Sequence, residues 1–194
     1  MWYNLGMIQK IITIPNPLLR QKSKPVGKID KKIEKVIADL LETVKNASEP
    51  EGLGLSAIQI GQLLRIFVAK TGKNFRVFIN PKITFSSKET LKKVLKKEQQ
   101  FFEGCLSIPG IYGFVDRPYQ IKMEWQDEKG RKHSRTFTNR NSVCLQHELD
   151  HLDGILFIDR LLKQKSSPRG EAGKIYELKK TQKGEDLFEE VELW

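Results

Sequence analysis

The chain has 194 residues, of which 39% are hydrophobic and 30% are charged, and this is enough for one globular domain with a sizeable core. The composition excludes a disordered or fibrous protein, and no apolar run reaches the roughly 20 residues that a membrane span needs. The net charge of +10 would favour polyanions such as RNA, but the lysines are scattered, so we interpret the charge as a solvated basic surface.

The first predicted element is an amphipathic helix near Asp30 to Asn46, in which apolar residues recur at helical spacing and Asp30 is the candidate N-cap. Two strands are predicted next, from Leu64 to Ala69 and from Arg76 to Asn80, and the pair Asn80-Pro81 is expected to end the second. Further along, residues 121–125 and 132–138 are predicted to form a hairpin around a turn at residues 127–130.

A second helix is predicted from Val143 to Leu152, with Asn141 as its candidate cap and Gly154 beyond its end. Strands followed by a late helix, without regular alternation, indicate one α+β domain. The chain contains only two cysteines, and its first residues do not have the pattern of a signal peptide. We therefore expect a cytoplasmic protein whose cysteines are free thiols or metal ligands.

The residues that point most directly to chemistry are His147-Glu148-Leu149-Asp150-His151, which fit the spacing His-Glu-x-x-His. On a helix, residues four positions apart share a face, so both imidazoles can bind one metal ion while Glu148 lies beside it. The alternative is a set of polar residues on an exposed helix. Because the chain has only three histidines and the flanking residues are apolar, we prefer metal binding.

A hydrolytic metal site needs a third protein ligand, and Cys105 in Glu103-Gly104-Cys105-Leu106-Ser107 is the best candidate. Taken alone, such a cysteine is more often a small buried hydrophobic residue. Cys144 is expected to pack beside the site, and His133 is expected to face solvent in the hairpin. The glycines between Gly52 and Gly61 do not follow a strand and lack a phosphate-loop lysine, so they do not indicate nucleotide binding.

Three segments together resemble the peptide deformylase family, whose motifs are Gly-x-Gly-x-Ala-Ala-x-Gln, Glu-Gly-Cys-Leu-Ser and Gln-His-Glu-x-Asp-His-Leu-x-Gly. The second motif is matched in full by residues 103–107 and the third by residues 146–154. The first is matched from Gly52 onward, except that Ser56 replaces the first alanine. The similarity extends roughly from Met7 to Leu162.

The resemblance implies a single α+β domain, residues 1–165, with antiparallel sheets packed around a central metal-ligand helix and an additional N-terminal helix. It implies hydrolysis of the formyl group from the N-terminal formylmethionine of newly synthesised polypeptides. By position, Cys105, His147 and His151 would hold one divalent ion, first of all Fe²⁺, with Ni²⁺, Co²⁺ or Zn²⁺ able to substitute. Glu148 would be the general base and then the general acid. Gln59 and the backbone N–H of Leu106 would stabilise the oxyanion.

By the same resemblance, Gly54 and Gly104 should offer their backbones to an extended peptide. The apolar pocket for the methionine side chain would be lined by Leu53, Phe101, Val143 and Cys144. Arg117 is expected to pair with Asp150 and to orient the ligand helix.

Two departures from the family pattern lead to further expectations. We expect the hydroxyl of Ser56 to need a hydrogen-bond partner or a little room, and to have little effect on the chemistry. Arg140 lies either at the mouth of the pocket or elsewhere on the surface. Residues 166–194 match no motif; we expect a C-terminal tail with a helix from Ile175 to Lys180, either contacting the ribosome or remaining unbound.

Formylmethionyl peptides and a transient ribosome contact are therefore the expected partners, with neither DNA nor a membrane among them, and the sequence leaves the oligomeric state open. Two alternatives remain at this point. One is a zincin-type protease, for which downstream acids such as Asp153 and Asp159 would have to supply the third ligand. The other is a non-catalytic RNA- or ribosome-binding module, for which neither Glu148 nor Gln59 would be required.

Overall fold

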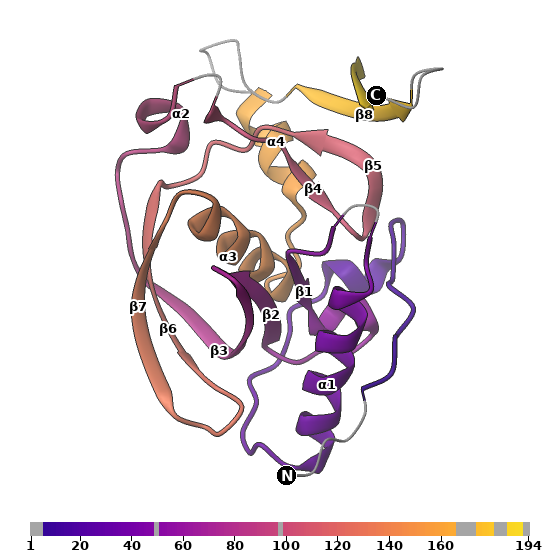
Figure 1. The fold of residues 1–194 in the computed structure, drawn as a ribbon, viewed down its shortest axis with the longest axis vertical. Helices are drawn as coiled ribbons and strands as arrows, with labels where there is room; N and C mark the ends of the chain where they lie inside the picture. The colour runs from indigo at the N-terminus through magenta and orange to yellow at the C-terminus, as the bar shows by residue number, and fades with distance from the viewer. Residues whose placement is uncertain (1–5, 49–50, 97–98, 166–173, 181–185, 192–194) are drawn as a thin grey trace.

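The computed structural model describes residues 6–48, 51–96, 99–165, 174–180 and 186–191 (Figure 1). Its elements, with η for a 3-10 helix, are η1 (Pro17–Arg20), α1 (Lys31–Lys45), β1 (Gly54–Ser56), η2 (Ala57–Ile60), β2 (Ile66–Thr71), β3 (Asn74–Ser86), α2 (Leu91–Val94), β4 (Glu103–Cys105), β5 (Ile108–Gly113), β6 (Gln120–Gln126), β7 (Lys132–Thr138), α3 (Asn139–Leu152), α4 (Phe157–Lys165), β8 (Ile175–Lys180) and β9 (Asp186–Val191). The strands form an antiparallel sheet in the order β1-β2-β3-β6-β7 and another in the order β4-β5-β8-β9. The predicted α+β class is confirmed.

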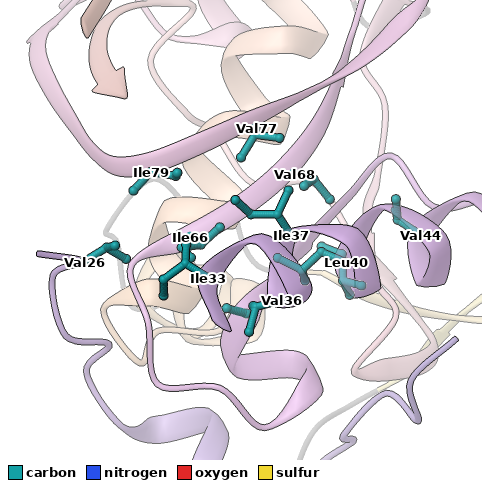
Figure 2. Packing of buried hydrophobic residues seen from close by; sticks show 12 residues of the cluster. Val26, Ile33, Val36, Ile37, Leu40, Val44, Ile66, Val68, Val77 and Ile79 are labelled. Carbon is teal, nitrogen blue, oxygen red and sulfur yellow. The ribbon is translucent and has the colours of Figure 1, made fainter. Parts of the chain in front are cut away.

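Helix α1 covers one face of the five-stranded sheet. Its start is fixed by Asp30, whose carboxylate accepts hydrogen bonds from the amides of Lys32 and Ile33, as its predicted role as N-cap requires. The apolar stripe of α1 packs against residues of β2 and β3 (Figure 2). Leu40, on this stripe, is fully buried. Removal of this apolar surface from water is what holds the helix on the sheet.

Helix α3 covers the opposite face of the same sheet. Successive side chains of a strand point to opposite faces, so Ile66 and Val68 of β2 join the cluster under α1, whereas Phe67 and Ala69 join the cluster under α3. Figure 1 shows α3 in the middle of the molecule, with the two sheets around it. The expected arrangement of sheets around a central helix is therefore confirmed.

Strand β3 is longer than predicted, because Asn80-Pro81 does not end it. The pairing with β6 shifts register between Ile79 and Lys82, so the proline lies in an irregularity of the ladder, where its missing N–H is tolerated. Asn80 adopts a positive φ of 50°, and its side chain bonds to both the N–H and the C=O of Val26. The pair Asn80-Pro81, which often forms a turn, is thus accommodated as a bulge within β3, because Val26 forms hydrogen bonds with the side chain of Asn80.

The ligand helix begins earlier than predicted. Helix α3 starts at Asn139 with Thr138 as N-cap, so the expected cap at Asn141 is wrong. Gly154 lies beyond the helix end with φ 72°, as expected.

The expectation of a helix at residues 175–180 is also wrong, because this segment is strand β8. It pairs with β5 and then with β9. One edge of β5 would otherwise leave its backbone N–H and C=O groups unpaired. A strand at residues 175–180 can pair with these groups, whereas a short helix bonds only within itself. Among the described residues, no helix is both long and apolar enough to cross a membrane.

Candidate metal centre and substrate pocket

Three metal-ligating side chains meet between α3 and β4. His147 and His151 lie one turn apart on α3, and Cys105 is the last residue of β4. Their ligand atoms all lie within 4.8 Å of one another, with the sulfur of Cys105 3.2 Å from Nε2 of His151. The predicted ligand set is therefore brought together by the fold.

The chemistry of this donor set fits a divalent transition metal. Burial raises the pKa of the Cys105 thiol, but the charges and hydrogen bonds of His151 and His147 outweigh burial and lower it to about 5. The sulfur is thus a thiolate at neutral pH, which is the form that binds metals. One thiolate with two imidazoles suits Zn²⁺ and Fe²⁺ as well as Co²⁺ and Ni²⁺.

Glu103 supports His147, one of the candidate ligands, on the side away from the cluster. Its Oε2 lies 3.0 Å from Nδ1 of His147, which fixes the ring and leaves Nε2 for the cluster. Burial raises the pKa of Glu103, but the charge of Arg117 and the hydrogen bond from His147 lower it below its usual value. From the sequence, Glu103 was named as part of a motif but was given no role. Its position two residues before Cys105 could have indicated a side chain close to the candidate ligands, because alternate residues of a strand share a face.

Arg117 joins Glu103 to the ligand helix. Its guanidinium is only 4% exposed, donates two hydrogen bonds to Glu103 at 2.6 and 2.9 Å, and donates a third to Asp150 at 2.8 Å. Arg160 also donates to Asp150, from the more exposed side. The expected pairing of Arg117 with Asp150 is confirmed, whereas Arg160 was not anticipated.

Glu148 is buried beside the candidate metal ligands, as its place on α3 predicts. Burial raises the pKa of its carboxyl, and this effect exceeds the opposing influence of His147, His151 and a hydrogen bond from Ser56. A buried carboxyl with a raised pKa is the kind of group that serves in proton transfer.

Gln59 presents its amide group to the same region from η2. Its Oε1 accepts a hydrogen bond from the backbone N–H of Ser56 at 2.8 Å. Its Nε2 donates to Ser107 at 3.0 Å and lies 3.7 Å from the sulfur of Cys105. The amide is therefore held with its donor side toward Cys105. Leu106 lies in the turn between β4 and β5.

A pocket of about 220 Å³ opens onto this cluster. Every residue expected from the resemblance to bind substrate lines it, namely Leu53, Gly54, Phe101, Gly104, Val143 and Cys144. The wall also includes Gln59, Cys105, Leu106, His147 and Glu148, so the pocket joins the reactive groups to an apolar surface. The sequence assigned no place in the pocket to four further wall residues, Glu51, Phe102, Glu103 and Tyr112, and Arg140, for which the pocket mouth was one of two alternatives, also lines it.

Two edge strands border the pocket at glycines. Gly54 belongs to β1 and Gly104 to β4, and each strand is the outermost of its sheet. A Cβ atom on Gly54 would lie 2.4 Å from Oε1 of Glu148, and one on Gly104 would lie 2.5 Å from the ring of Tyr112. A side chain at either position would therefore displace Glu148 or Tyr112, and both strands have an edge to which an extended peptide can add.

Three polar side chains named from the sequence are now placed. Arg140 lines the pocket, with its guanidinium 5.0 Å from the ring centre of Phe101, so it lies at the pocket and not elsewhere on the surface. The sulfur of Cys144 donates to the carbonyl of Leu53 at 3.6 Å, beside the site as expected. His133 is no part of the cluster, but it is half-buried, stacked on Trp125 and bonded to Asp127.

The downstream acids needed by the protease alternative have other partners. Asp153 accepts a hydrogen bond from Arg65 at 2.6 Å, and Asp159 pairs with Arg20. Within the described residues, the third donor beside the two histidines is Cys105.

Comparison with known proteins agrees with this geometry. The family model described as polypeptide deformylase matches residues 8–167. The peptide deformylase of Rhizobium meliloti is 43% identical over 163 residues, covering 81% of this chain and 87% of the relative, and that of Brucella suis is 40% identical with the same coverage. The solved structure of peptide deformylase from Thermotoga maritima superimposes with a TM-score of 0.71 at 34% identity, covering 80% of this chain and 98% of the other.

A structure from Synechococcus elongatus, solved in complex with actinonin, has a TM-score of 0.69 at 34% identity and covers 80% of this chain and 81% of the other. The chain therefore belongs to the peptide deformylase family, metal-dependent hydrolases that remove the formyl group from N-terminal formylmethionine.

Proposed function

We propose that this protein deformylates nascent polypeptides with Cys105, His147 and His151 as the ligands of one divalent ion and with Glu148 as the proton-transfer group. The observation that carries the proposal is the meeting of these three side chains, of which Cys105 and His147 line, together with Glu148, a pocket bordered by two edge strands.

The side chains divide the work as follows. When bound, a divalent ion supplies Lewis-acid chemistry, which acidifies water and polarises the formyl carbonyl. Glu148 takes the proton of the attacking water and then delivers it to the amine, which cannot leave as an anion. The amide of Gln59 and the backbone N–H of Leu106 stabilise the oxyanion, where loss of one donor typically costs ~10²–10³ in rate.

The rest of the pocket selects and orients the peptide. Leu53, Phe101, Val143 and Cys144 enclose the methionine side chain, and burial of that side chain contributes roughly 1.5–3 kcal/mol. Gly54 and Gly104 pair with the peptide backbone, so that the formyl group at the end of the chain meets Glu148. Fe²⁺ is the proposed resident ion, since one thiolate and two imidazoles suit it, with Zn²⁺, Ni²⁺ or Co²⁺ as substitutes.

The proposed catalytic domain comprises residues 1–165, because every residue assigned a role above lies between positions 53 and 151. Residues 166–194 follow this domain, and their described strands, β8 and β9, add to its sheet through β5. A transient ribosome contact in the cytoplasm follows from the substrate, and the net charge of +10 supports it. Cosedimentation with ribosomes that weakens as salt is raised would be the expected behaviour; binding that is absent at low salt would contradict it.

The activity is tested by formate release from a formyl-Met-Ala-Ser peptide. The protein is purified without oxygen and loaded with Fe²⁺ or Ni²⁺, and wild type is compared with Glu148→Ala and Cys105→Ala. We expect Glu148→Ala to keep its metal and to lose turnover, whereas Cys105→Ala loses metal. Absence of formate release by the loaded wild type would refute the proposed activity, and full metal content in Cys105→Ala would refute the ligand assignment.

A further inference from the structure

We propose that Ser56 is a positioning residue for Glu148, holding one oxygen of its carboxyl group so that the other faces the substrate pocket. The inference rests on the proposed role of Glu148 in proton transfer. It replaces the expectation that the hydroxyl of Ser56 has little effect on the chemistry.

The contact itself is short and sheltered from water. Ser56 is fully buried, and its Oγ donates to Oε2 of Glu148 at 2.7 Å, although the two residues are 92 positions apart. The same Oγ lies 3.0 Å from the backbone carbonyl of Glu148. A hydrogen bond to a charged group in a dry site is among the stronger ones in proteins, and Ser56 has two fixed acceptors within reach.

The other carboxyl oxygen is thereby directed toward the reaction. Oε1 lies against the backbone of Gly54, close enough that a Cβ atom there would be only 2.4 Å away, and both residues line the pocket. With Oε2 held by Ser56 and Oε1 confined by Gly54, the carboxyl group has one orientation. A general base must lie within hydrogen-bond reach of the proton it takes, so loss of this restraint lowers the rate.

The two acceptors also suit a group that gains and loses a proton during turnover. A hydroxyl is one donor and can accept as well. It donates to Oε2 at 2.7 Å and has the backbone carbonyl of Glu148 as a second acceptor at 3.0 Å, so Oε1 is the oxygen left to exchange the proton. Glu148 is then held in place at both stages.

Ser56 also caps η2 through a reciprocal pair of contacts with Gln59. The N–H of Ser56 donates to Oε1 of Gln59, and this bond does not depend on the Ser56 side chain, whereas the backbone N–H of Gln59 faces that side chain. Substitution at position 56 therefore keeps the bond to the Gln59 amide group, and an effect that passes through Gln59 would persist when Glu148 is itself substituted.

The test compares Ser56→Ala, Ser56→Thr and Ser56→Val, measuring kcat and KM for formyl-Met-Ala-Ser, metal content and Tm. Threonine and valine have the same shape, but only threonine keeps the hydroxyl. We expect kcat to fall roughly tenfold in Ser56→Ala and Ser56→Val relative to wild type, with KM within about twofold, and Ser56→Thr to recover most of the loss relative to Ser56→Val. Ser142→Ala removes another fully buried hydroxyl, which donates to Pro118 away from the pocket, and should leave kcat unchanged.

A double-substitution cycle separates this role from a structural one. In a Glu148→Gln background, Ser56→Ala should change the residual rate by less than about twofold, because the partner has already been altered. A kcat within twofold of wild type in Ser56→Ala, equal rates in the threonine and valine variants, or a fall in kcat that tracks loss of metal or Tm would each overturn the proposal. If the loaded wild type releases no formate, the proposed function fails instead.

Discussion

At the scale of single residues, the carboxylate of Glu103 joins a proposed metal ligand to a buried arginine. We predict that Glu103→Gln weakens metal binding roughly 10- to 100-fold, because His147 loses the charged acceptor that fixes its ring. Competition for Ni²⁺ with a chelator measures the change. Glu124→Gln, at an exposed position of β6, is the control and should bind metal as wild type does. Equal affinity in Glu103→Gln would show that His147 needs no such support.

Asp127 provides a pH-dependent test far from the metal ligands. Burial alone would raise the pKa of its carboxyl, but hydrogen bonds from His133, from the side chain and amide of Arg131 and from the Lys129 amide outweigh burial and hold it well below its usual value. A carboxyl group with a depressed pKa stabilises the folded state above its unfolded pKa of about 3.9, and this contribution is lost as the pH falls through the folded value.

The expected result is a difference between wild type and Asp127→Asn that depends on pH. Near pH 7 the variant should be less stable by about 1–2 kcal/mol in urea unfolding. The difference should shrink as the pH is lowered below about 4, where Asp127 in the unfolded wild type binds a proton that it does not bind in the folded state and that the variant cannot bind at all. A difference that stays constant from pH 7 to pH 3 would contradict the assignment.

At the scale of elements, two arginines, Arg117 and Arg160, both bind the carboxylate of Asp150 on α3, but one arginine is buried and the other is partly exposed. Arg117 is buried with Glu103 and Asp150, whereas the Arg160 side chain is 40% exposed. We predict that Arg117→Ala costs about 3–5 kcal/mol, because it leaves buried carboxylates without a partner. Arg160→Ala should cost less than about 1 kcal/mol. Urea unfolding and metal analysis measure both; unchanged stability and metal content in Arg117→Ala would show that it does not orient α3.

The elements that sequence predicts well are those specified by their own residues. Helix α1 has a local cap at Asp30 and a continuous apolar stripe, and the spacing of His147 and His151 is fixed by one turn of helix. The wrong predictions concern segments whose structure depends on contacts with a part of the chain far away in sequence. Asn80 becomes part of a bulge because Val26 satisfies its side chain, and residues 175–180 become a strand because β5 has a free edge.

At the scale of the whole molecule, the site depends on contacts between segments far apart in the chain. Cys105 meets His151 across 46 positions, and Ser56 meets Glu148 across 92. The motifs were enough to name Cys105, His147 and His151 as candidate ligands, because each residue type has a known chemistry, and the fold brings their ligand atoms together. The orientation of Glu103 and of Ser56 could not, because only the packing of β1 and β4 against α3 defines it.

The C-terminal hairpin β8–β9 extends this packing to the outer wall of the pocket. Tyr112 of β5 lies opposite Gly104 on one side and Tyr176 on the other, which places a row of residues on one face of the sheet. Phe188 of β9 contacts Tyr112 with 5.3 Å between ring centres, and Phe102 with 5.5 Å. Because Tyr112 and Phe102 line the pocket, the hairpin supports a wall that the peptide must pass.

We therefore predict that Phe188→Ala raises KM for formyl-Met-Ala-Ser by about two- to tenfold, the range expected for loss of aromatic pairs of roughly 0.5–1.5 kcal/mol. Metal content and kcat should stay within about twofold, because the ligands and Glu148 lie on other elements. Leu187→Ala is the matched control: this neighbour is similarly exposed but alternates to the other face of β9, so its KM should equal that of wild type. Equal KM values for the two variants would show that Phe188 does not support the pocket wall. A fall in kcat together with loss of metal in Phe188→Ala would show that Phe188 affects the metal-binding residues instead.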